Sequence, residues 1–171
     1  FAHSGLDDIM PLVPELSQSD TSRLDVTPYP PDAFYDDLLR LSEGCSDPEL
    51  TSLLVDCSYE TVRWMQSIGV RFEMYATSIK HGGRTFFPAG GVVQFWGGGQ
   101  ALTQSLLRAA QGRGVDVAYD APALEVVRDV RGAMHGVRVG MGDDVTTIPA
   151  GAVVLACGGF EANSEMRARY L

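Results

Sequence analysis

Apolar residues recur at helical spacing in three segments of the chain, and a glycine follows each of them. The pattern predicts helices over residues 31–41, 48–68 and 100–111, and a short helical turn over residues 6–10. Asp47 is expected to cap the second helix, with Pro48 in its first turn. We expect the apolar stripe of this helix to face the core: Leu50, Leu53, Leu54, Cys57, Trp64, Met65 and Ile68.

Short β-rich runs dominate the rest of the pattern. They predict strands over residues 70–74, 115–119, 123–128, 136–139, 145–148 and 152–156. Glycine and aspartate in the gaps between the third, fourth and fifth runs favour an antiparallel meander of three strands. The last run is apolar throughout, so we expect it to be buried on both faces. The fold class expected is mixed α/β, a small sheet of parallel strands plus the meander, covered by the helices.

The segment 75–99 is rich in glycine and aromatic residues and has little periodicity. We expect a long structured loop with strand pieces, although a flexible insert is the alternative. Three parts follow along the chain. They are a lead segment on the surface (1–30), a helical and loop region (31–99) and a C-terminal part (100–171).

Composition excludes several classes of function. The 171 residues are 45% hydrophobic, which suits one principal domain. A formal charge of −9 opposes binding to nucleic acid or an anionic membrane. No apolar run is long enough for a transmembrane segment. Cys45, Cys57 and Cys157 lack disulfide or metal-ligand spacing, so no metal site is expected. Free thiols favour a cytoplasmic location, and Cys157 is expected to be buried.

The stretch from Val153 to Asn163 carries the strongest chemical signal. It reads Val-Val-Leu-Ala-Cys-Gly-Gly-Phe-Glu-Ala-Asn, an apolar run that ends in two glycines before a helix start. Glycine lets the backbone turn sharply and lets a nucleotide lie against bare peptide groups. A buried strand that merely ends in Gly-Gly is the alternative. Gly97, Gly98 and Gly99 form a second glycine-to-helix junction.

Four stretches resemble the FAD-binding domain of the fumarate reductase and succinate dehydrogenase flavoprotein family, and most of all its tricarballylate dehydrogenase-type members. They are Gly83-Arg84-Thr85, Gly97 to Leu102, Gly114 to Tyr119 with Leu124 to Asp129, and Val153 to Asn163. The resemblance implies a Rossmann-like domain that is incomplete here. The Gly-x-Gly-x-x-Gly fingerprint that holds a pyrophosphate is missing, so we expect a piece of a longer protein.

The resemblance also implies an FAD-dependent oxidoreductase. Hydride would pass between flavin N5 and a carbon–carbon bond of a small-molecule substrate, a di- or tricarboxylate. By matching position, the cofactor would lie against Gly97, Gly98 and Gly99 on the flavin side. Ala123 and Leu124 would meet the adenine, and Ala156, Cys157, Gly158, Gly159 and Asn163 the adenosine and pyrophosphate half.

Catalytic groups are hard to find within the 171 residues. In the family, the arginine and histidine cluster lies mostly in a capping domain that would follow Leu171, so we expect this piece to be inactive alone. Arg84 is a weak candidate for pairing a substrate carboxylate, and a solvated loop charge is the alternative. His81 lies beside it in sequence, Tyr75 resembles a packed aromatic residue, and His3 and His135 are expected at the surface.

Two other functions remain open. A ketosteroid-type FAD-dependent desaturase shares the Gly-Gly corner, and a non-catalytic binding or structural module derived from a flavin fold fits the missing fingerprint. An exposed sheet edge would favour a homo-oligomer.

Overall fold

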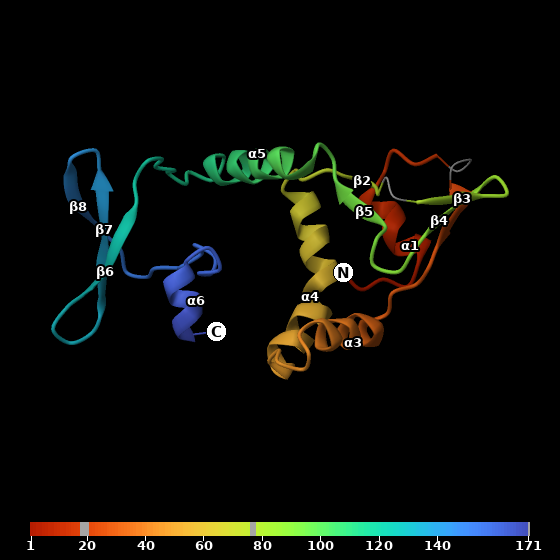
Figure 1. Ribbon diagram of the computed structural model, residues 1–171. Coiled ribbons are helices and arrows are strands. Elements are labelled where there is room, and N and C mark those ends of the chain that lie inside the picture. Colours follow the sequence, from red (N-terminus) through yellow and green to blue (C-terminus); the bar gives the residue numbers. More distant parts are fainter. Residues whose placement is uncertain (18–20, 76–77, 171) are drawn as a thin grey trace. The chain divides into compact units, whose positions relative to one another are not determined.

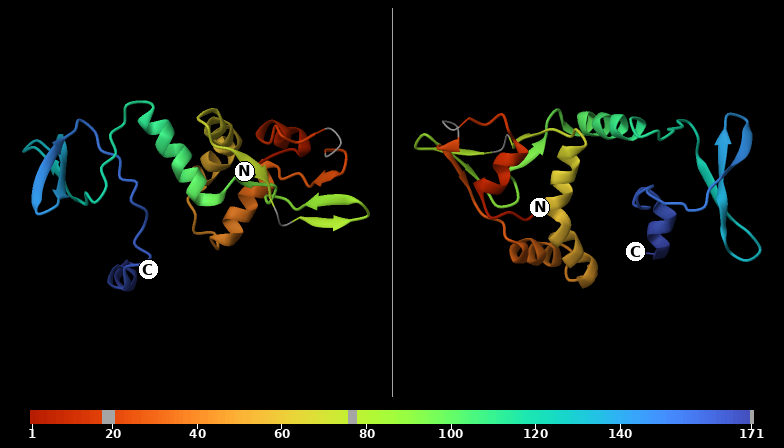
Figure 2. Two further views of the ribbon diagram at one scale, coloured as in Figure 1. Left: turned by 90° about the horizontal axis from the view of Figure 1, so that it is seen from above. Right: turned by 180° about the vertical axis from the view of Figure 1, so that it is seen from behind.

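The computed structural model describes residues 1–17, 21–75 and 78–170. It divides into two compact units, Phe1–Val115 and Asp116–Leu171 (Figure 1 and, in two further views, Figure 2). The expected three-part division of the chain stays a prediction.

The first unit begins with a helical turn, as expected. The helix α1 (Leu6–Ile9) continues into a 3-10 helix, η1 (Met10–Leu12). Ile9 and Leu12 are almost completely buried, with exposed fractions of 0% and 1%. The expectation that residues 1–30 lie on the surface is therefore wrong, because this segment supplies side chains to both core clusters of the unit. Prolines in it prevent a long regular element but not burial.

Two helices form where the periodicity predicts them. They are α3 (Pro31–Leu41) and α4 (Pro48–Ser67), which pack against one another. The side chain of Asp47 accepts hydrogen bonds from the backbone nitrogens of Glu49 and Leu50, at 2.9 and 3.0 Å, which confirms the predicted cap.

The buried face of α4 differs from the expected one. Thr51 and Val55 are buried, whereas the stripe members Leu50, Leu53 and Leu54 are 55–66% exposed. Trp64 is also 57% exposed. Met65 of the stripe does pack against a core cluster, together with Tyr59 and Val62 from outside the stripe, because tertiary packing decides which face of a helix is buried.

Short strands make two sheets in the first unit. The strand β1 (Leu24–Val26) pairs in parallel with β4 (Arg84–Phe87), and β3 (Ile79–His81) pairs antiparallel with the other edge of β4. The strand β2 (Phe72–Met74) pairs antiparallel with β5 (Val93–Phe95). The loop predicted over residues 75–99 thus contains strand pieces, as expected, and Phe87 and Val92 within it are buried. The helix α5 (Gly98–Gln111) closes the unit and contacts β5.

The second unit contains the predicted meander. Its strands are β6 (Ala123–Arg128), β7 (Met134–Met141) and β8 (Asp144–Pro149), in the order β6-β7-β8 with antiparallel pairing. A short helix, α6 (Ser164–Tyr170), follows the Gly-Gly corner. The mixed α/β class, with a parallel pair and a three-stranded meander, is confirmed.

Two predicted strands do not form. Residues 115–119 and 152–156 carry no strand, and Val154 and Leu155 are 88% and 72% exposed rather than buried on both faces. A strand needs a hydrogen-bonding neighbour, and no described segment pairs with either run. The expected single sheet is also wrong, because the described strands form three separate sheets.

Candidate functional site

The glycine turn before α5 exposes bare backbone in the first unit. Gly97 and Gly98 have φ angles of 73° and 68°, in the left-handed region that glycine adopts without strain. A Cβ atom at Gly97 would lie 2.9 Å from the Cβ of Ala101, whereas at Gly98 or Gly99 it would meet nothing within 4 Å. Because α5 begins here, its first backbone N–H groups have no partner within the helix. This turn suits close approach by a flat or phosphorylated ligand.

A cavity of about 200 Å³ lies beside the start of α5. Its apolar wall includes Trp96, Ala101 and Leu102. The guanidinium of Arg71 stacks over the Trp96 ring, 4.7 Å from the ring centroid. A nitrogen of Arg71 also lies 2.8 Å from the carboxylate of Glu15. Its hydrogen bond lowers the pKa of Glu15. The indole beside the glycine turn is thus held in place by a stacked, ion-paired arginine.

The Gly-Gly corner of the second unit is also open. Gly158 has a φ of 75°, and a Cβ there would meet nothing within 4 Å. At Gly159 a Cβ would contact the carboxylate of Glu161, the far end of a flexible side chain. Ala156 and Cys157 are exposed. The expectation of a buried Cys157 is wrong, because the run before it joins no described sheet.

Three further predicted cofactor residues belong to the second unit. Ala123 and Leu124 begin β6 and are exposed, Leu124 to 55%. Oδ1 of Asn163 accepts a 3.0 Å hydrogen bond from the backbone nitrogen of Met166, so Asn163 caps α6. Its amide NH2 group keeps its donors for other use. The assignment of all these residues to a cofactor stays a prediction.

Arg84 lies at the start of β4, with one guanidinium nitrogen 3.4 Å from Oδ2 of Asp25. It lines a surface hollow together with Lys80 and His81, and none of the predicted cofactor residues lines that hollow. Tyr75 is 40% exposed, and its backbone nitrogen donates to the carbonyl of Val92 at 2.8 Å. Nothing in these contacts separates Tyr75 from a packed aromatic residue.

The prediction from the sequence differs most from the structure at His3. It was expected at the surface, yet it is 4% exposed and packs near the rings of Phe1 and Tyr29. Neither ring nitrogen has a hydrogen-bond partner among the described residues. Burial lowers the pKa of its imidazole. A single histidine in a segment without periodicity gives no signal of burial.

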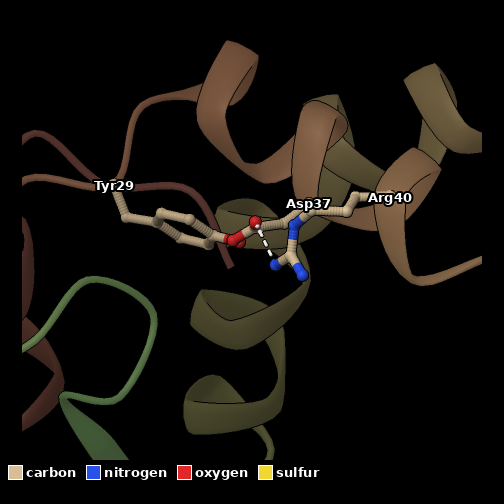
Figure 3. Close-up of polar contacts among 3 residues, drawn as sticks. All are labelled: Tyr29, Asp37 and Arg40. Atoms are coloured by element: carbon tan, nitrogen blue, oxygen red, sulfur yellow. Dashed lines mark hydrogen bonds and ion pairs between the residues drawn. The ribbon is translucent and has the colours of Figure 1, made fainter.

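His3 also lines a cavity of about 370 Å³ in the first unit. Asp8, Tyr59 and Val55 are among the other wall residues, and the hydroxyl of Tyr59 donates to the carbonyl of Asp8 at 2.9 Å. The backbone of His3 forms a bridge with Tyr29, whose hydroxyl contacts Asp37 (Figure 3).

Two further observations bear on the kind of site. Among the described residues, no group of three or more His, Cys, Asp or Glu side chains is placed to hold a metal ion. In the same part of the chain, no helix has the length and apolar character needed to cross a membrane.

Known proteins share both sequence and fold with this chain. The fumarate reductase (cytochrome) of Shewanella frigidimarina is 30% identical over 144 residues, which are 81% of this chain and 24% of that protein. The 3-oxosteroid 1-dehydrogenase of Comamonas testosteroni is 43% identical over 75 residues, 43% of this chain and 13% of that protein. The open conformation of a flavocytochrome c3 fumarate reductase matches with a TM-score of 0.64 at 25% identity. That match covers 82% of this chain and 24% of the other.

The chain therefore spans about a quarter of the length of the fumarate reductases that it matches. The match of the FAD binding domain model is more extensive, since it runs over residues 21–170. Because this range takes in most of the sequence, the chain belongs to the FAD binding domain family of flavoproteins.

Proposed function

We propose that this chain is part of a longer FAD-dependent oxidoreductase of the fumarate reductase type, acting on a di- or tricarboxylate. The observation that carries the proposal is the family match over residues 21–170, together with 30% identity to a fumarate reductase over 144 residues. A relation to tricarballylate dehydrogenases rests on the sequence resemblance alone, and a cytoplasmic location rests on the free cysteines.

The exposed glycines fit the cofactor. Open space next to the backbone at Gly98, Gly99 and Gly158 is what a bound dinucleotide needs, since a side chain at these positions would occupy its place. FAD, when bound, supplies the hydride acceptor and donor. In this proposal Gly97 to Gly99 approach the flavin side, Ala123 and Leu124 contact the adenine, and the corner from Ala156 to Gly159 lies along the adenosine and pyrophosphate.

The direct test uses the gene with its natural upstream region. We expect purified protein to show the visible absorption of a bound flavin and to oxidise a reduced electron donor when fumarate is added. Protein that stays colourless after reconstitution with FAD would instead support a non-catalytic module derived from a flavin fold.

Substitutions at two matched glycines test where the cofactor binds. Gly158 and Gly142 have φ angles of 75° and 63°, and a Cβ at either meets nothing within 4 Å. Substitution by valine therefore strains both backbones similarly. We expect Gly158→Val to weaken FAD binding in the longer protein at least tenfold and Gly142→Val to leave it nearly unchanged. Equal losses would mean that the corner has no special role.

A steroid substrate is the second candidate, favoured by the 43% identity to a 3-oxosteroid 1-dehydrogenase over 75 residues. The same flavin-loaded protein distinguishes the two. Reduction of its flavin by a 3-ketosteroid, with no response to fumarate, would favour the desaturase. Arg84 as a partner for a substrate carboxylate stays a prediction.

A further inference from the structure

A cationic hollow of about 330 Å³ lies at the tight turn between β3 and β4. Its wall includes Arg23, Lys80, His81, Arg84 and Thr85, with Gly82 and Gly83 forming the turn. Lys80 is the single lysine of the chain. The molecule carries a formal charge of −9, so this concentration of positive charge runs against its overall composition.

Backbone pairing brings the cations together. The backbone nitrogen of Thr85 donates to the carbonyl of Arg23 at 2.8 Å, which holds the chain before β1 against β4. On the other edge of β4, Lys80 is paired with Thr85 and His81 with Arg84. Arg23, Lys80 and Arg84 therefore come from three different segments and line one hollow.

The carboxylates of the described residues offset little of the positive charge on Arg23, Lys80 and Arg84. Asp25 is the only carboxylate paired with these cations among the described residues, and its contact with Arg84 is long, 3.4 Å, with both side chains 49% exposed. The side chains of Arg23 and Lys80 form no hydrogen bond or ion pair within the described part of the chain. Cations held near one another repel, and a bound anion removes that repulsion.

We propose that this hollow binds a phosphate group, either as inorganic phosphate or as part of a small phosphate ester. A planar carboxylate matches one guanidinium fork, whereas a tetrahedral phosphate offers acceptor oxygens in several directions. Two arginines supply directed donors, and Lys80 supplies a compact charge. None of its residues is assigned to FAD, but Arg84 is also the predicted partner of a substrate carboxylate, and a comparison of phosphate with succinate separates the two roles.

Lys80 makes the site measurable without any enzyme activity. An amine-acylating reagent modifies lysine side chains and the amino terminus of the protein, Lys80 is the single lysine among the 171 residues, and mass spectrometry quantifies each modification. At constant ionic strength, we expect saturating phosphate or glycerol phosphate to slow acylation of Lys80 about tenfold and to leave the amino terminus unaffected. Protection by either compound supports the site. Absence of protection by both, or equal protection by succinate at the same concentration, overturns it.

Charge variants test the geometry. We expect Arg84→Gln and Arg23→Gln each to raise the half-protecting phosphate concentration about tenfold, and Arg84→Lys to raise it less, because the charge remains while the fork is lost. Arg63→Gln is the matched control, since Arg63 is exposed on α4 and does not line the hollow. An equal rise in the half-protecting phosphate concentration in Arg63→Gln would show that only the net charge matters, and it would overturn the proposal.

Discussion

The hydroxyl of Tyr29 donates a 2.9 Å hydrogen bond to Oδ2 of Asp37, and the same carboxylate receives a guanidinium nitrogen of Arg40 at 2.7 Å (Figure 3). This contact ties the segment before α3 to the helix itself. Arg40 first, and then Tyr29, lower the pKa of Asp37. Burial first, and then the bond to Asp37, raise the pKa of Tyr29.

Replacing Tyr29 by phenylalanine should therefore loosen the start of α3. The variant keeps the buried ring and loses the donor, so we expect a small decrease in the urea midpoint, larger at pH 7 than at a pH low enough to protonate the Asp37 carboxylate, whose pKa is lowered. Tyr35→Phe is the control, because the Tyr35 hydroxyl has no partner among the described residues. A midpoint equal to that of the native chain at both pH values would show that the contact contributes nothing.

Acidification should destabilise the first unit through His3. Burial lowers the pKa of this imidazole, and Asp8 partly opposes the effect. The unfolded chain binds a proton near the ordinary value of 6.5 and the folded chain only at lower pH. The contribution of neutral His3 to the free energy of unfolding is thus complete above pH 6.5, and it is lost as the pH falls below this value.

Denaturation curves at pH 7.5 and 5.5 measure this loss. We expect His3→Phe to show a smaller drop between the two pH values than the native chain, and His135→Phe, on the exposed part of β7, to match the native chain. An undiminished drop in His3→Phe would assign the pH dependence to other groups.

The cap of α4 is a local contribution to stability. Asp47→Ala removes two hydrogen bonds from the first turn and should cost about 1 kcal/mol. Asp56→Ala, on the exposed side of the same helix, provides the comparison. Urea unfolding followed by far-UV circular dichroism gives both values, and a similar cost in the two variants would contradict a specific role for Asp47.

The meander depends on one close backbone approach. A Cβ at Gly136 would overlap the carbonyl oxygen of Ile148 on β8, which cannot yield without breaking the pairing. We expect Gly136→Ala to cost more than about 2 kcal/mol or to prevent the sheet from forming. Gly151→Ala introduces a methyl group into open space and should change little. Tolerance of Gly136→Ala, judged by amide exchange in β7 and β8, would contradict a close approach of Gly136 to Ile148.

Self-association follows from the exposed apolar run at residues 152–156. Val154 is 88% exposed in a segment that has no strand partner among the described residues. Such a run can recruit a strand from another copy. Light scattering should detect oligomers that Val154→Asp reduces and that Val130→Asp, in a turn where the valine is even more exposed, does not. A monomeric native chain at high concentration would refute this prediction.

Local features were the most predictable from the sequence. The Asp47 cap, the ends of α3 and α4 and the turns of the meander depend on residues within a few positions of one another. The glycines of the candidate site were also identifiable, because left-handed backbone at Gly97 and Gly158 favours that residue type. The sequence did not reveal that His3 is buried or that Arg23, Lys80 and Arg84 cluster. Backbone pairing between segments that are far apart in the sequence brings these side chains to their positions.

The sequence by itself determined the helices and the three-stranded meander, because periodicity, capping and turn residues act over short distances, and its resemblance to known flavoproteins indicated the family. Only the tertiary structure decided that Val55 rather than Leu54 is buried, that His3 lies inside, and that residues 152–156 form no strand. Burial depends on which neighbours are present to exclude water, and a strand exists only where another strand accepts its hydrogen bonds.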